Sequence, residues 1–240
     1  MIYDIDVLIA KLEAIGNLPE EHRQALRNLP LQKASVERGH DVVMDGNIMT
    51  HCCIVLSGML HRHKTMKDGS RQVISFHPAG DIPDLQSLHL RKVDYTLSAT
   101  TRSQIALVEH SAIRDMLHNQ PKLTDLMWRD TLIDSAKFLT WMMLVGQASA
   151  EARMAHLFCE IYTRLNAVGD VSGYAFAFPA TQSDIADALG MSIVHANRTL
   201  QMLRSESLLA FANGQAEILD WPRLSRLAQF DSSYLHLSGE

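Results

Sequence analysis

The chain has 240 residues, 47% of them hydrophobic, and a formal net charge of -5 at pH 7. This length is enough for two domains that each bury a core, and the charge excludes a protein that binds nucleic acid through bulk positive charge alone. The N-terminus is acidic, with Asp4 and Asp6, and the longest apolar run, near residues 138–145, is too short to cross a bilayer. We therefore expect a cytoplasmic protein with no membrane partner.

Two short amphipathic segments open the chain, at residues 4–15 and 19–29. Their apolar residues recur at helical spacing, which predicts two small covering helices. From about residue 35 to residue 108 the pattern changes to short runs punctuated by glycine, such as "CIVLSG", "RQVISF" and "SQIALVE". Such runs are typical of an antiparallel sandwich or barrel, and Asp68-Gly69 favours a hairpin turn.

A helical stretch follows from near His110, is interrupted at Pro121 and continues to about residue 147. Residues recur within it at alternating steps of four and three, namely Trp128, Leu132, Ser135, Leu139, Met142 and Gly146. This spacing predicts a dimer seam, although a helix packed only on its own domain can give a similar pattern. A second apolar stripe is formed by Leu126, Ile133, Ala136 and Met143. Two stripes favour a helix that faces its own β domain on one side and a second copy of the chain on the other.

The segment around Gln147 is a candidate hinge, because another helix is expected at residues 150–165. Near the C-terminus, "LLAFANGQAEIL" predicts a hairpin that turns at Asn213-Gly214. Strands are expected near residues 175–178, 208–211 and 216–219, and a short helix from residue 221 to about residue 230.

The segment "TQSDIADALGMSIVHANRTLQMLR", residues 181–204, has the features of a helix-turn-helix. Thr181 can cap a first helix, with Asp184 three residues later in a capping-box arrangement. Gly190 stands where the chain must reverse, and Ser192 can cap the second helix. Small or apolar residues supply the buried contacts between the helices, namely Ile185, Ala186, Leu189, Ala196, Leu200 and Leu203.

The same segment supplies the candidate DNA-contacting residues, namely Thr181, Gln182, Ser192, Ile193, Val194, His195, Asn197, Arg198 and Gln201. Arginine, asparagine and glutamine carry donors suited to base edges. Residues 192–204 contain no acid, so one helix face can be positive although acidic residues outnumber basic ones from Ala148 onward. Ile193 and Val194 either meet thymine methyl groups or pack at the start of the helix.

The order of β-roll, long helix and winged helix-turn-helix resembles the Crp/Fnr family of bacterial transcription regulators over about residues 18–227. The local matches are "VLSGML", "KDGSRQVISFHPAGD" and "SDIADALGMSIVHANRTLQMLR". The resemblance implies an α+β fold with an antiparallel, jelly-roll-like β-roll at residues 1–120, a dimerisation helix at 121–146 and a winged helix-turn-helix at 147–240. It also implies a homodimer that binds a palindrome in double-stranded DNA and regulates transcription by contact with, or exclusion of, RNA polymerase.

The roll departs from the members of this family that bind cyclic nucleotides. After Gly-Asp those members carry a glycine and a glutamate for the ribose, then Arg-Ser or Arg-Thr for the phosphate, whereas residues 80–99 here read "GDIPDLQSLHLRKVDYTLSA". A buried phosphate needs a cation or several donors, so we expect no cyclic AMP binding of the usual kind. The residues that could line a pocket for another effector are Asp81, Asp84, Arg91, Tyr95 and Thr96.

The cysteines and histidines give no clear cofactor site. Cys52, Cys53 and Cys159 are not the N-terminal cluster of the iron-sulfur members, and adjacent cysteines on a strand point to opposite faces. A haem or metal sensor is conceivable because His61 and His63 share a strand face, with His51 and His77 nearby, but surface or hydrogen-bonded histidines are the commoner case. We expect no metal site and leave the effector unidentified.

The recognition helix also departs from the family. Members that read the common half-site tend to begin this helix with Arg-Glu, whereas Ile193-Val194 stand here, while Arg198 matches the later base-contacting arginine. We therefore expect a different half-site. The alternative is a sensor or interaction protein whose winged domain binds a protein, which the acidic C-terminal third favours. An enzyme has little support, because no glycine-rich phosphate loop, nucleophile elbow or metal-ligand pair is present.

Overall fold

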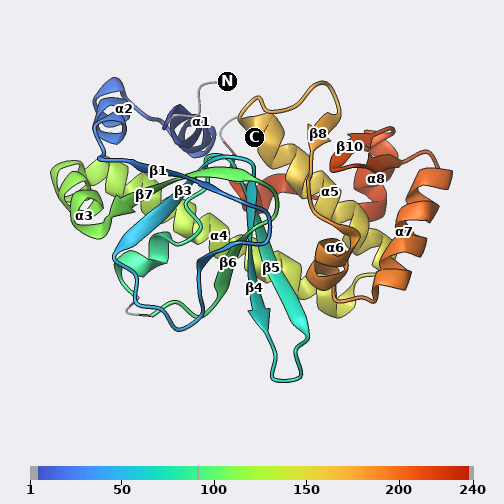
Figure 1. The fold of residues 1–240 in the computed structure, drawn as a ribbon. Coiled ribbons are helices and arrows are strands. Elements are labelled where there is room, and N and C mark those ends of the chain that lie inside the picture. Colours follow the sequence, from blue (N-terminus) through green and yellow to red (C-terminus); the bar gives the residue numbers. More distant parts are fainter. Residues whose placement is uncertain (1–4, 91, 238–240) are drawn as a thin grey trace.

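The computed structural model describes residues 5–90 and 92–237. It has a β-roll flanked by helices, a long helix, and a C-terminal domain that packs beside the roll (Figure 1). The α+β class and the order of roll, long helix and winged helix-turn-helix are confirmed.

The two N-terminal helices, α1 (Asp6–Ile15) and α2 (Glu20–Arg27), cover one side of the roll (Figure 1). The buried residues of α1 share one face of the helix because of their spacing, namely Leu8, Ile9, Leu12 and Ile15. They belong to a core that also contains Leu56 of the roll and Leu126 of the long helix. The N-terminal helices therefore hold the roll and the long helix together.

The roll consists of two antiparallel sheets with strand orders β1-β7-β3 and β2-β6-β4-β5. The strands are β1 (Gln32–Val36), β2 (Asp41–Val43), β3 (His51–Ser57), β4 (Met59–Thr65), β5 (Arg71–Pro78), β6 (Thr96–Ala99) and β7 (Ser103–Glu109). A core that includes Val55, Leu60 and Leu97 lies between the sheets. β4 and β5 continue past the core as a hairpin, in which Gly69 takes a φ of 85° and Asp68 accepts the backbone N–H of Ser70 at the predicted turn.

Two helices connect the roll to the C-terminal domain, α3 (His110–Asn119) and α4 (Pro121–Gln147). Pro121 starts α4, where its missing N–H costs nothing. The stripe that faces the chain's own core was predicted with one error. Leu126 and Ile133 are buried as expected, but Met143 is 58% exposed and Leu144 is buried instead. Leu144 follows Ile133 by eleven residues, which is about three helical turns, so these two residues lie on the same face of α4.

The C-terminal domain is a winged helix-turn-helix with the elements α5 (Ala150–Ala167), β8 (Ala175–Ala177), α6 (Gln182–Leu189), α7 (Ile193–Ser205), β9 (Leu209–Ala212), β10 (Gln215–Ile218) and α8 (Trp221–Ala228). A short turn, η2 (Ser232–Leu235), follows and lies against α4 and α5. The wing is the antiparallel sheet β8-β10-β9. Its predicted turn is confirmed, with φ of 52° at Asn213 and 74° at Gly214.

The C-terminal domain and the roll share one hydrophobic core, which includes Met59, Val73 and Phe76 of the roll. The ring of Phe76 lies edge-on to that of Phe178, with centroids 5.1 Å apart, and Phe178 contacts Phe158 of α5 at 5.4 Å. Only Ala148 and Ser149 separate α4 from α5, at the predicted hinge. The contact of Phe76 with Phe178 therefore joins the roll to the C-terminal domain in addition to this short connection.

The cysteines are buried and unpaired. Cys52 belongs to the core between the roll and the helices, and Cys53 to the interior of the roll, so the adjacent pair does face opposite sides of β3. Burial raises the pKa of both thiols, and raises that of Cys159 to about 12. Over residues 5–90 and 92–237, no three His, Cys, Asp or Glu side chains are grouped as metal ligands, and no helix is long and apolar enough to span a bilayer.

Candidate nucleic-acid interface

The first helix of the motif, α6, begins with the predicted capping box. Oγ1 of Thr181 accepts the backbone N–H of Asp184 at 3.0 Å, and Oδ2 of Asp184 accepts the backbone N–H of Thr181 at 2.9 Å. These bonds satisfy two groups that the helix terminus would otherwise leave unpaired. Thr181 is half-buried and Gln182 is exposed, so Gln182 is the freer of the two predicted contacts on α6.

The turn between α6 and α7 depends on Gly190. Its φ is 61°, in the left-handed region, and its N–H bonds to the carbonyl of Ala186. A Cβ at this position would meet only the side chain of Val145, at 3.4 Å, so backbone conformation and not space demands glycine. Ser192 then caps α7, with Oγ accepting the backbone N–H of His195 at 3.2 Å.

Apolar side chains fix α7 to α6 as predicted, since Ile185 and Leu189 of α6 are buried with Ala196 and Leu203 of α7. The outer face of α7 is exposed, including Ser192, His195, Arg198 and Gln201. Ile193 is 49% exposed and Val194 is 70% exposed, so within this chain neither is tucked in at the start of the helix. Asn197 is only half-buried, and its Oδ1 is buried without a hydrogen-bond partner among the described residues.

A contact that the sequence did not predict joins this motif to the roll. Arg71 of β5 donates from Nε to Asp187 at 2.8 Å and from Nη2 to Asp184 at 2.7 Å. Beside it, the Gln72 amide donates to the carbonyls of Asp187, at 2.7 Å, and Ala188. Burial would raise the pKa of Asp184, but hydrogen bonds from Thr181 and Arg71 hold it below its usual value. Two acids of α6 are thus paired by the roll itself.

Comparison with known proteins agrees with this architecture in both parts of the chain. Residues 152–227 match the Crp-like helix-turn-helix domain, and residues 33–120 match the cyclic nucleotide-binding domain. The chain belongs to the Crp/Fnr family. This Crp/Fnr protein is a transcription regulator of the helix-turn-helix type.

Among curated Crp/Fnr relatives, the chain is 26% identical to the transcriptional activator protein FnrL of Cereibacter sphaeroides, over 82% of this chain and 81% of that protein. It is 27% identical to the nitrogen fixation regulation protein FixK of Bradyrhizobium diazoefficiens, over 79% of each. Its fold is similar to the structure of FixK2 from Bradyrhizobium japonicum, with a TM-score of 0.75 at 22% identity, covering 83% of this chain and 98% of that one.

Residues of the predicted effector pocket of this Crp/Fnr protein have separate partners within the chain. Asp81 accepts from Arg164 of α5 at 2.7 Å and lies 2.9 Å from Nδ1 of His77. Oγ1 of Thr96 accepts the backbone N–H of Asp45 at 3.3 Å. Arg91 lies outside the described residues.

The other two predicted pocket residues are buried. Asp84 is 0% exposed, and its Oδ1 accepts the backbone N–H of Cys53 at 2.8 Å, while Oδ2 has no partner among the described residues. Burial raises the pKa of Asp84 to about 7. The hydroxyl of Tyr95 accepts from Gln86 at 2.9 Å and donates to the carbonyl of Pro83 at 3.3 Å. Neither side chain is free to meet a phosphate.

The space between the roll and α4 is also too small for a nucleotide. A cavity of about 20 Å³ lies there, lined by Arg62, Asp81, Asp134 and Lys137 among others, and a neighbouring cavity of about 50 Å³ lies beside Lys11 and Arg164. Pockets for small molecules usually hold at least about 300 Å³. These residues therefore do not fit a cyclic nucleotide.

The histidines of the roll are engaged with each other and with neighbouring hydroxyls. The rings of His61 and His63 lie 5.3 Å apart, and Nδ1 of His61 is 3.0 Å from Oγ1 of Thr100. Burial is the main cause that lowers the pKa of His61 to about 4. His61 is therefore a buried, hydrogen-bonded histidine of β4.

Proposed function

We propose that this regulator reads double-stranded DNA as a homodimer, with α7 of each copy in the major groove. The observation that carries the proposal is the capped and glycine-turned α7, which leaves Ile193, Val194 and Arg198 exposed while its opposite face is buried. A helix held by its inner face can enter a groove as a rigid unit. Arg198 would bond a guanine edge, and the two apolar residues would meet thymine methyl groups.

The dimer contact is assigned to the outer face of α4. The predicted seam is exposed along the helix, at Trp128 (60%), Leu132 (52%), Leu139 (61%) and Met142 (69%), with Ser135 exposed between them. Another face of α4, which includes Ile133 and Trp141, is buried against its own chain. An apolar stripe at heptad spacing on the free side of a long helix suits a second copy of the same helix. RNA polymerase is the further partner that we propose, through contact or exclusion at the promoter.

The test is selection from a pool of random duplex DNA with purified protein, at two salt concentrations and without added ligand. A DNA-reading dimer should enrich a palindrome whose half-sites lie about one helical turn apart. Its affinity should fall steeply as salt rises, because phosphate contacts release counterions. If no sequence is enriched and binding to a protein partner is insensitive to salt, the winged domain binds protein and the proposal is wrong.

A further inference from the structure

The side chain of Arg62 contacts Pro83 and Tyr95, in the segment of residues 80–99 that corresponds to the nucleotide-holding segment of other family members. Arg62 lies on β4 and is 3% exposed. Its Nε donates to the carbonyl of Pro83 at 2.7 Å, Nη2 donates to the same carbonyl, and Nη1 donates to Asp134 of α4 at 2.6 Å. The guanidinium carbon lies 5.0 Å from the ring centroid of Tyr95 and 5.7 Å from that of Phe138. One side chain thus joins a strand, the segment that would hold a nucleotide, and α4.

The charge of Arg62 is balanced from α4. Asp134 also pairs with Lys137 at 2.8 Å, and although burial alone would raise the pKa of Asp134, the two cations hold it well below its usual value. A buried guanidinium is tolerated when its donors are satisfied and a carboxylate faces it. Both conditions hold at Arg62, so the side chain is fixed in place.

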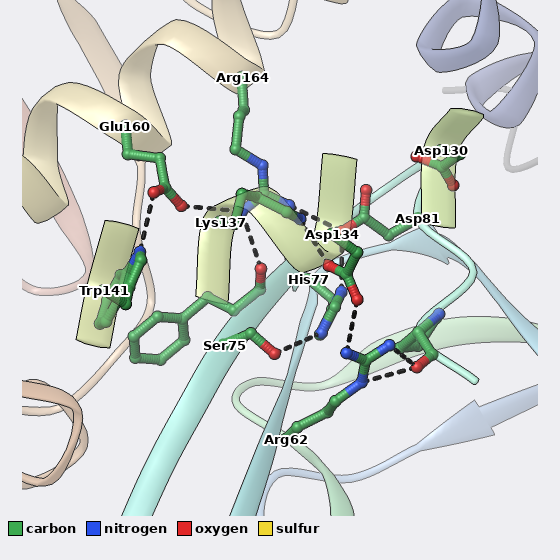
Figure 2. A network of polar contacts seen from close by, with 12 residues as sticks. Arg62, Ser75, His77, Asp81, Asp130, Asp134, Lys137, Trp141, Glu160 and Arg164 are labelled. Carbon is green, nitrogen blue, oxygen red and sulfur yellow. Dashed lines mark hydrogen bonds and ion pairs between the residues drawn. The ribbon is translucent and has the colours of Figure 1, made fainter. Parts of the chain in front are cut away.

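The same layer of charge continues into the DNA-reading domain (Figure 2). Arg164 of α5 pairs with Asp81 at 2.7 Å and with Glu160 at 3.5 Å, and Glu160 accepts the indole N–H of Trp141 at 2.8 Å. The roll, α4 and α5 are therefore connected by buried ion pairs and hydrogen bonds. Asp134 and Trp141 both lie on α4, so the contacts of Arg62 and those of Arg164 meet on this helix.

We infer that Arg62 acts as a built-in occupant of the roll, which holds the roll, α4 and the reading domain in the DNA-binding arrangement without a small-molecule effector. This inference rests on the proposed function. A guanidinium supplies a planar charge, hydrogen bonds to both sides and faces for the aromatic rings, which are the contacts that a bound ligand would otherwise make. The cavity that remains beside Arg62, of about 20 Å³, leaves no room for a second occupant of nucleotide size.

The experiment replaces the side chain by a free molecule of the same chemistry. Arg62→Ala leaves a space for one guanidinium, and Asp134 keeps its partner Lys137. We expect Arg62→Ala without additive to bind the selected duplex about tenfold more weakly than the unchanged protein. Methylguanidinium should restore most of this affinity and should raise the melting temperature of the variant, because a ligand that binds the folded state stabilises it. Methylammonium, which has the charge without the planar fork, should do neither.

Arg102→Ala is the matched control, since Arg102 is an exposed arginine of the same roll that pairs at the surface with Glu37, at 3.3 Å. It should bind DNA as the unchanged protein does, and methylguanidinium should change neither its DNA affinity nor its melting temperature. If folded Arg62→Ala binds DNA with unchanged affinity, or if methylguanidinium does not raise its melting temperature, the inference is wrong. The melting readout needs no DNA, so it separates failure of this inference from failure of DNA reading. If Arg62→Ala does not fold, Arg62→Lys keeps the charge but not the fork, and unchanged DNA affinity in that variant would also contradict the inference.

Discussion

Arg71 on β5 bonds Asp184 on α6, with 2.7 Å between Nη2 and Oδ1, and Asp184 is the residue that completes the capping box with Thr181. The carboxylate of Asp184 therefore caps the first helix of the helix-turn-helix and also bonds that helix to the roll. Because Arg71 is partly exposed, solvent screens this contact, and its contribution to the free energy of unfolding is small. Its main effect is to hold α6 in position against the roll.

Arg71→Ala should loosen α6 without unfolding the protein. The loss should be roughly 1 kcal/mol in the free energy of unfolding, while hydrogen exchange of the α6 amides becomes faster. Affinity for DNA should also fall, since Asp184 and Asp187 lose a positive partner and their negative charge repels the phosphates. Lys67→Ala, which removes an equal charge at the tip of the same hairpin, is the control. Equal exchange rates in the two variants would show that Arg71 does not hold α6.

Arg198→Ala should weaken binding to the selected duplex by about 1–3 kcal/mol and relax discrimination at one position of each half-site. The reason is loss of a bidentate contact with one base, and competition binding against single-base variants of the duplex measures it. Arg27→Ala removes the same charge from α2, on the far side of the molecule in Figure 1, and should leave the base preference unchanged. A uniform loss over all sequences with Arg198→Ala would mean that Arg198 contacts phosphate.

Met142→Glu should separate the dimer, because it places a charge in the apolar seam of α4. We expect the dissociation constant in sedimentation equilibrium to rise roughly tenfold or more. Met44→Glu is the matched control, since Met44 is also a largely exposed methionine (54%) but lies on the roll. A dimer of unchanged stability with Met142→Glu would place the interface elsewhere.

Asp84→Asn should make the protein more stable above neutral pH. The pKa of Asp84 is raised from 3.8 to about 7 by burial, so between about pH 4 and pH 7 the folded state keeps a proton that the unfolded chain has lost. Stability contributed by this group is therefore present at low pH and is lost as pH rises through 7. Asparagine is neutral and can still accept from Cys53, so the variant should gain up to a few kcal/mol at pH 8.

Chemical denaturation between pH 4 and pH 8 measures this difference. The slope of stability with pH should be flatter in Asp84→Asn than in the unchanged protein over that window. Asp115→Asn, an exposed carboxylate on α3, should keep the original slope. A variant as pH-dependent as the unchanged chain would show that Asp84 does not hold a proton in the folded state.

The capping box and the glycine turn of the helix-turn-helix could be predicted from the sequence, because each depends on residues that are close together in the chain. Thr181 and Asp184 are three residues apart, and the positive φ of Gly190 follows from the turn alone. The contact of Arg71 with Asp184 joins residues 113 positions apart, and that of Arg62 with Asp134 joins residues 72 apart. The sequence around an arginine on a strand does not indicate which acid it pairs with, because the packing of whole domains brings the two residues together.

The partners of the predicted effector-pocket residues were not evident from the sequence for a related reason. The family pattern indicates which segment would face a ligand, but Asp84 accepts the backbone N–H of Cys53 in the core, and Arg62 of β4 bonds the carbonyl of Pro83. Likewise, Met143 was placed on the inner stripe of α4, whereas the helical repeat brings Leu144 there. Spacing alone does not separate neighbouring positions at the edge of a buried stripe.

The spacing between half-sites tests the central claim most directly. A second duplex is made from the selected one by inserting about five base pairs, which is half a helical turn, between the half-sites. The affinity and mass of the complex with each duplex are then measured without added ligand. If two α7 helices of one dimer read the two halves, the insertion places the second half on the opposite side of the duplex, and affinity should fall at least roughly tenfold. Equal affinity for the two duplexes would contradict a DNA-reading dimer, because the halves would then be bound independently.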